Sequence, residues 1–463
     1  MAREKLGSRL GFILLSAGCA IGIGNVWKFP YMAGQYGGGL FVLIYIFFLV
    51  VMGLPIMTME FAVGRASQKS PLKAFKVLEK PNQKWHLHGY ACIAGNYILM
   101  MFYTVVAGWM LHYFYLMASG EFENNTASQI SEKFTDMVSS PSTLTFWMVI
   151  IVALGFFVCS IGVQKGLERV TKVMMVALLA IMVVLAINSI FLDGGSQGLK
   201  FYLIPSLESV RTVGDGNLVK GFGEVIVGAM NQSFFTLSLG IGSMAIFGSY
   251  IGKERSLLGE SVNIAVLDTF VAITSGLIIF PACFAYGVEP NSGPPLIFET
   301  LPNIFVKLPF GRVLGSLFFV FLTFAAFSTV LAVFENIISC VMDLTGWSRK
   351  KTCLINTILM IVLSMPCVLG FNLLSGFTPF GAGSNLMDLE DFAVSNIILP
   401  IGALVFLLFC TSRYGWGWKN FKEEANQGKG LKVFDGMRVY VTYILPIIVL
   451  FLFAFGIYSK FAG

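Results

Sequence analysis

Residues 16–39 read SAGCAIGIGNVWKFPYMAGQYGGG, and this stretch decides the fold. It lies largely within the first long apolar run, residues 10–33, yet several glycines and Pro30 interrupt that run. An interior glycine costs a helix about 1 kcal/mol and a proline about 3 kcal/mol, so the pattern favours an opening near residues 20–24. Backbone groups freed at membrane depth are tolerated where they line a cavity, so the opening is a candidate binding site. The alternative is that the glycines only allow close helix packing.

Composition places the whole chain in a lipid bilayer. Hydrophobic residues make up 56% of its 463 residues and charged residues only 12%, and the mean hydropathy is +0.79. A soluble domain of this length does not bury so much apolar surface. We therefore expect one all-α polytopic membrane domain over residues 1–463. Runs of about 20 or more apolar residues, the length that a bilayer core requires, predict eleven transmembrane helices, spans one to eleven: residues 10–33, 39–64, 88–117, 143–161, 166–191, 222–250, 258–285, 310–342, 352–373, 389–411 and 438–460.

The distribution of lysine and arginine predicts the orientation. With a cytoplasmic N-terminus, 23 of the 31 basic residues lie in cytoplasmic segments, 7 lie outside, and Lys28 lies within span one. This bias indicates a multi-pass protein of the cell (inner) membrane with its C-terminus outside. It also accounts for the net charge of +6, so neither a nucleic-acid partner nor an obligatory protein partner is inferred.

A second apolar run is interrupted by glycines as the first one is. Residues 231–250 of span six read NQSFFTLSLGIGSMAIFGSY, with two glycines and a serine in the middle. Spans one and six are five apart, and interrupted helices at corresponding places of two halves indicate a transporter site at the bilayer midplane. The predicted repeats cover about residues 10–191 and 222–411, followed by an extra helix at about 438–460.

Span eight supplies a third element. Ala325, Ser328, Thr329 and Ala332 form a small, hydroxyl-bearing stripe at helical spacing. Hydroxyls together with carbonyls freed by a broken helix supply the oxygen ligands that a hard cation such as sodium needs. The alternative is that the hydroxyls bond to their own helix.

These segments resemble a known family. The runs GCAIGIGNVWKFPYMAGQYGGG (18–39), GLPIMTMEFAVGR (53–65), FFTLSLGIG (234–242) and AAFSTVLAVFE (325–335) look like those of the neurotransmitter:sodium symporters, most closely the bacterial amino-acid transporters. The resemblance implies the 5+5 inverted-repeat, leucine-transporter-like fold with helices one and six broken.

The resemblance also implies two sodium sites and the position of the substrate. The substrate would bind with its carboxylate near the amides of residues 23–24 and the hydroxyl of Tyr103, and with its amine facing carbonyls of the broken helices. The first sodium site would use the carbonyl of Ala20 and the side chains of Asn25, Thr236 and Asp268, completed by the substrate carboxylate. The second would use carbonyls of Gly18, Ile21 and Ala325 with the hydroxyls of Ser328 and Thr329. Residues expected to bind substrate are Ala20, Ile23, Gly24, Leu99, Tyr103, Phe235, Thr236, Ser238, Ile241, Thr329, Ala332 and Val333.

Specificity follows from one position and from the pocket. Monoamine carriers that resemble this site have an aspartate where this chain has Gly22, so an α-amino acid is the expected substrate. The apolar pocket favours a hydrophobic or aromatic side chain. Ile241 and Val333 stand where the leucine transporter has larger residues, so we expect a cavity that also accepts Trp, Tyr or Phe.

The resemblance implies two gates, and this sequence differs from the family at several positions. Lys28 and Asp391 map to the outer gate, which a lysine makes looser or water-bridged. The inner gate maps to Arg3 and Asp343, beside Ser249 and Tyr250, and Glu60 is expected to support the broken helices from span two. Asp268 is hypothesised to supply the negative charge that chloride supplies in relatives, which makes transport chloride-independent. Val176 replaces a proline that lets span five unwind, so inward release either proceeds without unwinding or involves a break elsewhere.

The predicted activity is sodium-coupled amino-acid symport by alternating access, not catalysis, since no Walker lysine motif or catalytic constellation is present. The alternatives are a non-transporting amino-acid sensor, a sodium-gated channel on the same scaffold, or a symporter of a different small amine or amino acid.

Overall fold

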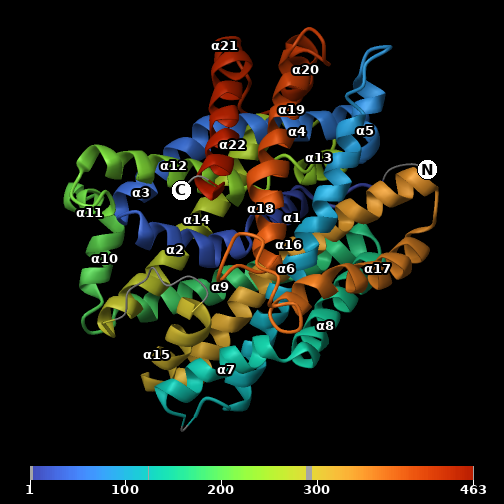
Figure 1. Cartoon of the computed structure of the whole chain (residues 1–463). Helices are drawn as coiled ribbons and strands as arrows, with labels where there is room; N and C mark the ends of the chain where they lie inside the picture. The colour runs from blue at the N-terminus through green and yellow to red at the C-terminus, as the bar shows by residue number, and fades with distance from the viewer. Residues whose placement is uncertain (1–3, 124, 288–294, 462–463) are drawn as a thin grey trace.

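The computed structural model describes residues 4–123, 125–287 and 295–461, and within these ranges it is helical with no β-strand (Figure 1). Short helices connect the spans: α5 (Pro71–Leu78), α7 (Ala127–Ser139), α10 (Ser196–Leu203), α11 (Leu207–Val213), α15 (Leu301–Lys307) and α20 (Trp418–Ala425). The helical fold predicted from the apolar runs is confirmed.

The unbroken spans follow the predicted apolar runs closely. They are α3–η2–α4 (Gly39–Ser67), α6 (Leu87–Ser119), α8 (Pro141–Ser160), η3–α9 (Val163–Ile190), α14 (Leu257–Ala285), α16 (Gly311–Thr345), α17 (Arg349–Gly370), α18–η5–α19 (Leu386–Thr411) and α21–η6–α22 (Met437–Phe461). The longest two, α6 and α16, have 33 and 35 residues and pack along each other at the centre of the bundle (Figure 1). They form the frame against which the interrupted helices lie.

The predicted count of eleven spans is not established by length and composition. In the described part of the chain, nine helices meet these criteria, and a tenth is a bent pair, α1 (Arg9–Ala20) with the segment Gly24–Gln35. The predicted sixth span, 222–250, is divided between α12 (Leu218–Thr236) and α13 (Ser243–Gly248). Its middle six residues are not helical, so it is no continuous apolar helix, and eleven stays a prediction, as do the repeat boundaries.

Span one opens where its glycines lie. The helix α1 ends at Ala20, and the chain resumes as the π-helical turn η1 (Gly24–Lys28) and α2 (Phe29–Gln35), bent by 57° from α1. Close packing also occurs here, since a Cβ on Gly18 would lie 3.2 Å from the Ser328 and Thr171 side chains. The opening and the close packing predicted for this stretch therefore coexist.

Span six opens over residues 237–242. Ser238, Gly240 and Gly242 adopt φ values of +50°, +102° and +75°, in the left-handed region that glycine enters without steric cost. The short helix α13 then packs against α4 (Leu54–Ser67) so closely that a Cβ on Gly248 would meet the carbonyl of Phe61. Gly240 and Gly242 are thus suited to the break, whereas Ser238 adopts the left-handed region although it carries a side chain.

Span five has no opening at the position of the missing proline. Val176 lies inside α9 (Arg169–Ile190), which is uninterrupted, and the irregular turn is η3 (Val163–Glu168), after Gly162 with φ +114°. The two alternatives for inward release both remain predictions.

Candidate functional site

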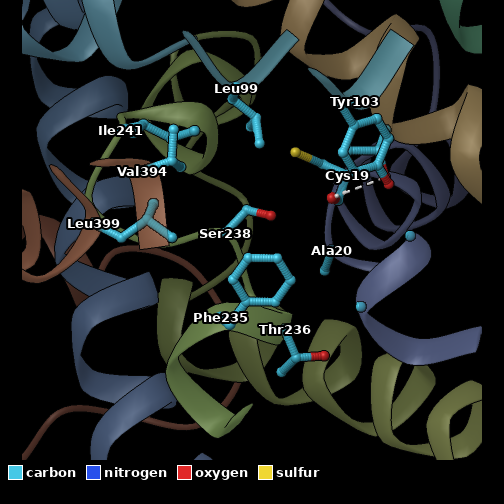
Figure 2. A pocket seen from close by; sticks show the side chains of 13 residues that line it. Cys19, Ala20, Leu99, Tyr103, Phe235, Thr236, Ser238, Ile241, Val394 and Leu399 are labelled. Carbon is cyan, nitrogen blue, oxygen red and sulfur yellow. Dashed lines mark hydrogen bonds between the residues drawn. The ribbon is translucent and has the colours of Figure 1, made fainter. Parts of the chain in front are cut away.

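A cavity lies between the two interrupted helices (Figure 2). α6 and α16 contribute to its wall, and so do η5 (Ala393–Ile398) and α19 (Leu399–Thr411). Nine of the twelve predicted substrate residues line it: Ala20, Gly24, Leu99, Tyr103, Phe235, Thr236, Ser238, Ile241 and Thr329.

The other three predicted residues are placed differently. The backbone N–H of Ile23 donates to the hydroxyl of Tyr103 at 3.0 Å, at the edge of the cavity. Ala332 and Val333 are fully buried in α16 and do not line the cavity. Four lining residues were not predicted as substrate contacts, namely Cys19, Gly22, Val394 and Leu399. The last two are among the many apolar residues of span ten, so the sequence does not single them out as cavity residues.

The ligands predicted for the second sodium site come together between α1 and α16. The hydroxyl of Thr329 donates to the carbonyls of Gly18 and Ile21 at 3.2 and 3.3 Å. The hydroxyl of Ser328 lies 3.4 Å from the carbonyl of Ile21 and 3.0 Å from that of Ala325. The cluster thus brings five uncharged oxygen atoms together, three from carbonyls and two from hydroxyls. Such a set of oxygen ligands suits a hard monovalent cation.

The side chains predicted for the first sodium site also form one cluster. The amide of Asn25 donates to Asp268 Oδ1 at 2.8 Å and to the hydroxyl of Thr236 at 3.1 Å, and Thr236 donates to Asp268 Oδ2 at 3.1 Å. The hydroxyl of Tyr45 lies 3.5 Å from the same carboxylate.

The Asp268 carboxyl is completely buried in the middle of α14. No lysine or arginine forms an ion pair with it in the described ranges. A buried carboxylate is costly unless it is paired with a positive charge. The cluster therefore fits a cation, and Thr236, which also lines the cavity, connects it to the substrate space.

Glu60 supports the break in span six from α4. Its side chain is fully buried, and Oε1 accepts the backbone N–H of Gly240 at 2.5 Å. The supporting role of Glu60 stays a prediction.

On the predicted outer side, Lys28 and Asp391 do not form an ion pair. Lys28 Nζ lies 3.8 Å from the centroid of the Phe235 ring, and Asp391 accepts a hydrogen bond of 2.8 Å from Ser395. Phe235 also borders a second cavity, shared with Lys28, Met32 and residues of span ten. The ring therefore lies between the central cavity and this outer one.

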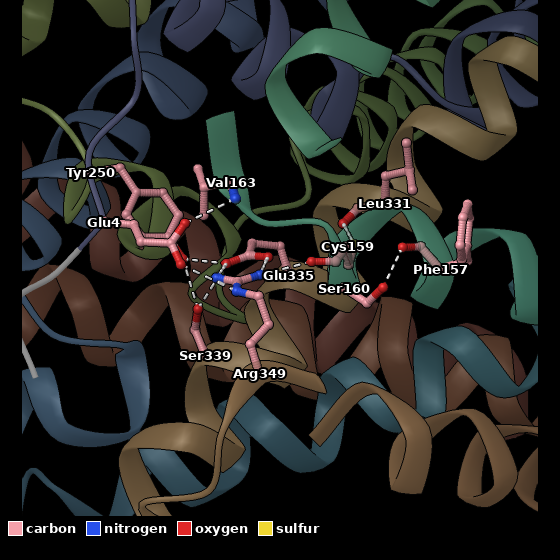
Figure 3. A network of polar contacts seen from close by, with 10 residues as sticks. All are labelled: Glu4, Phe157, Cys159, Ser160, Val163, Tyr250, Leu331, Glu335, Ser339 and Arg349. Atoms are coloured by element: carbon pink, nitrogen blue, oxygen red, sulfur yellow. Dashed lines mark hydrogen bonds and ion pairs between the residues drawn. The ribbon is translucent and has the colours of Figure 1, made fainter. Parts of the chain in front are cut away.

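On the predicted inner side, Arg3 lies outside the described residues. Asp343 accepts the backbone N–H of Ser70 at 2.9 Å, and Ser249 donates to its own helix. Tyr250 donates to Glu335 at 2.5 Å, and Arg349 pairs with both oxygens of Glu335 (Figure 3).

The Glu335–Arg349 pair was missed by the sequence analysis. Glu335 is completely buried in span eight. Such an acid needs a partner. In the sequence, Arg349 stands out only as one of the basic residues that predict the orientation.

Two helices broken at mid-span, a cavity between them and two adjoining oxygen-rich clusters are the features of a secondary transporter that binds a solute together with a cation. The whole chain matches the family described as "Sodium:neurotransmitter symporter family", over residues 3–122 and 116–462. The protein belongs to this family, and it is a sodium-dependent transporter.

Relatives and a solved structure agree with this assignment. An uncharacterized sodium-dependent transporter of Bacillus subtilis, YhdH, is 34% identical over 98% of both chains. One from Haemophilus influenzae is 30% identical over 97% of both chains. The crystal structure of MhsT in complex with L-phenylalanine superposes with a TM-score of 0.86 at 34% identity, covering 98% of this chain and 99% of that one. The leucine-transporter-like fold is thereby confirmed.

Proposed function

We propose that this protein is a symporter that couples the uptake of an α-amino acid with a hydrophobic or aromatic side chain to sodium. One observation carries the proposal: Thr236 belongs both to the cavity wall and to the Asn25–Asp268 cluster. A solute carboxylate in the cavity would therefore lie within reach of a cation at that cluster. Substrate and sodium would then bind together, because each supplies charge that the other needs.

The chemistry of the cavity favours an amino acid over a simple amine. None of its thirteen lining residues is charged, so a lone ammonium group would find no counter-charge there. An amino acid brings both charges, and the partial charges of helix ends and freed carbonyls can bind them. The apolar side chains of Leu99, Phe235 and Ile241 would surround its side chain. MhsT, which shares 34% of its sequence with this protein, binds L-phenylalanine.

The second cluster would link sodium to movement. It joins carbonyls of α1 to hydroxyls of α16, so a cation there would hold the broken helix against the central frame. We infer that sodium release frees α1 to move and opens the cavity inward. Two sodium sites, a cytoplasmic N-terminus, an external C-terminus and location in the cell membrane belong to the same proposal. Lys28 and Asp391 would form the outer gate, and Asp343, Arg3, Ser249 and Tyr250 the inner one.

Uptake of labelled leucine, tryptophan and tyrosine into proteoliposomes tests the proposal. With an inward sodium gradient we expect concentrative uptake, and with potassium in place of sodium we expect none. Sodium-dependent binding without accumulation would indicate a sensor, and current far above substrate flux would indicate a channel. If none of the three is bound or transported, the substrate class is wrong.

Chloride independence has its own test. The buried carboxylate of Asp268 provides a fixed negative charge within the Asn25–Thr236–Asp268 cluster, so replacing chloride with gluconate is expected to leave uptake unchanged. The Asp268→Asn variant is expected to lose most of its uptake, because the cation then lacks a counter-charge. A wild-type rate that falls in gluconate would contradict the hypothesis.

A further inference from the structure

The opened segment of span six is held in place from several helices at two neighbouring residues. The N–H of Gly240 donates to Glu60 of α4, and the thiol of Cys92 in α6 lies 3.8 Å from the carbonyl of Gly240. The next carbonyl, that of Ile241, accepts from Asn96 Nδ2 of α6 at 3.0 Å and from Asn336 Nδ2 of α16 at 3.4 Å.

The two asparagines form a single buried unit. Asn336 Nδ2 also donates to Asn96 Oδ1 at 3.2 Å, and Asn96 Nδ2 donates to the carbonyl of Cys92 at 2.7 Å. The thiol of Cys340 donates to Asn336 Oδ1 at 3.6 Å. Asn96 is 1% exposed and Asn336 is 0% exposed. Since buried amides are costly unless hydrogen-bonded, these contacts fix the orientation of both side chains.

The residue whose carbonyl they hold is also a wall of the cavity. The side chain of Ile241 points into the cavity opposite Tyr103 (Figure 2). Asn96 lies about one helical turn before Leu99, and Asn336 about two turns after Thr329; both Leu99 and Thr329 line the same cavity. The asparagine pair therefore connects three walls of one cavity: α6, α16 and the opened segment.

We propose that Asn96 and Asn336 are positioning residues that hold the side chain of Ile241 in place, and thereby limit the size of the substrate side chain. The proposal rests on the function proposed above. Without either amide, the Ile241 carbonyl would be free to turn and its side chain to withdraw. The cavity would widen, and bulky side chains would gain affinity relative to small ones.

The test is the affinity of purified wild-type and variant protein for leucine and for tryptophan in saturating sodium. In N96A and N336A we expect the ratio of tryptophan to leucine affinity to rise at least fivefold. In N336S, whose hydroxyl keeps one donor, we expect a smaller rise. The sodium concentration for half-maximal binding should stay within twofold of the wild-type value, which distinguishes positioning from a general loss of structure.

Asn356→Ala is the matched control. Asn356 is also a buried amide, 1% exposed, and it bonds to Tyr97 of α6, but it has no hydrogen bond to residues 237–242. Its replacement should leave the affinity ratio unchanged. An unchanged or lower ratio in N96A and N336A, or an equal rise in N356A, would overturn the proposal.

A double-mutant cycle tests whether the asparagines act through Ile241. In an I241A background, N336A should change the affinity ratio by less than twofold, because the side chain that it releases has been removed. A full, additive change would contradict the proposal. If the wild-type protein binds neither amino acid, the proposed function fails; if it binds both and the ratio does not respond, only the positioning role fails.

Discussion

The two interrupted helices are opened in different ways. In span one the break is short. The carbonyls of Gly18 and Ile21 face the hydroxyls of Ser328 and Thr329, while the N–H groups of Gly22 and Ile23 donate to the side chains of Asn25 and Tyr103. In span six the break runs over residues 237–242, and side chains of Glu60, Asn96 and Asn336 hold its backbone.

This difference separates a responsive segment from a fixed one. A hydroxyl rotates freely and can turn a lone pair toward a cation. The neighbouring carbonyl oxygens, no longer accepting the hydroxyl proton, can then bind the same cation. A buried carboxylate or amide that is hydrogen-bonded to the backbone is expensive to displace. We infer that the freed carbonyls of span one respond to the second sodium ion, whereas the opened segment of span six, residues 237–242, provides a constant wall that selects the substrate.

Gly22→Ala should have the largest effect, because it fills the break in span one. The added Cβ would meet the hydroxyl of Tyr103 and lie 2.6 Å from Thr329 Oγ1. We expect substrate affinity to fall ~100-fold, which corresponds to about 2.7 kcal/mol, measured by equilibrium binding in sodium. Gly223→Ala is the control, since a Cβ there has no atom within 4 Å. An equal fall in substrate affinity in Gly22→Ala and Gly223→Ala would contradict the role given to the open space in span one.

Thr329→Val should have an intermediate effect, because it keeps the shape of the side chain and removes one cation ligand. We expect the sodium concentration for half-maximal substrate binding to rise about tenfold, or about 1.4 kcal/mol. Thr323→Val on the same helix removes a hydroxyl that bonds only to the carbonyl of Phe319, and it should leave that concentration unchanged. A sodium response of T329V that matches T323V would show that the hydroxyl is structural.

Glu60→Gln should have the smallest effect, and on substrate rather than sodium. Glutamine still accepts the N–H of Gly240, but a neutral acceptor bonds less strongly than a carboxylate. We expect substrate affinity to weaken about twofold to threefold, or roughly 0.5 kcal/mol, with an unchanged sodium response. A shift in sodium dependence as large as that of T329V would remove the distinction between the two breaks.

Spans and breaks were predictable because they depend on local sequence. Span three was predicted at residues 88–117 and is Leu87–Ser119, since apolar length determines it. The glycines that open span six lie at the residues with positive φ. The hydroxyls of Ser328 and Thr329 were predicted as cation ligands from their helical spacing. Their carbonyl partners and the cluster around Asp268 were predicted only through the family resemblance, because no local pattern brings spans one, six, seven and eight together.

Contacts between distant buried faces were not predictable in the same way. Val394 and Leu399 line the cavity, but they are two of many apolar residues in span ten, and nothing in the sequence distinguishes them from the others. Asn96 and Asn336 are 240 residues apart, and neither shows that it bonds to the other or to Ile241. The contacts of such residues can be recognised only from the three-dimensional arrangement of α6, α16 and the opened segment.

The most direct test of two distinct breaks is the number of radioactive sodium ions bound per chain at saturating substrate. The account predicts two ions for the wild-type protein and clearly fewer than two for T329V at the lowest sodium concentration that saturates the wild type, with N336A retaining two. A single ion in the wild type, or a loss of one ion in N336A but not in T329V, would contradict the assignment of ion binding to span one.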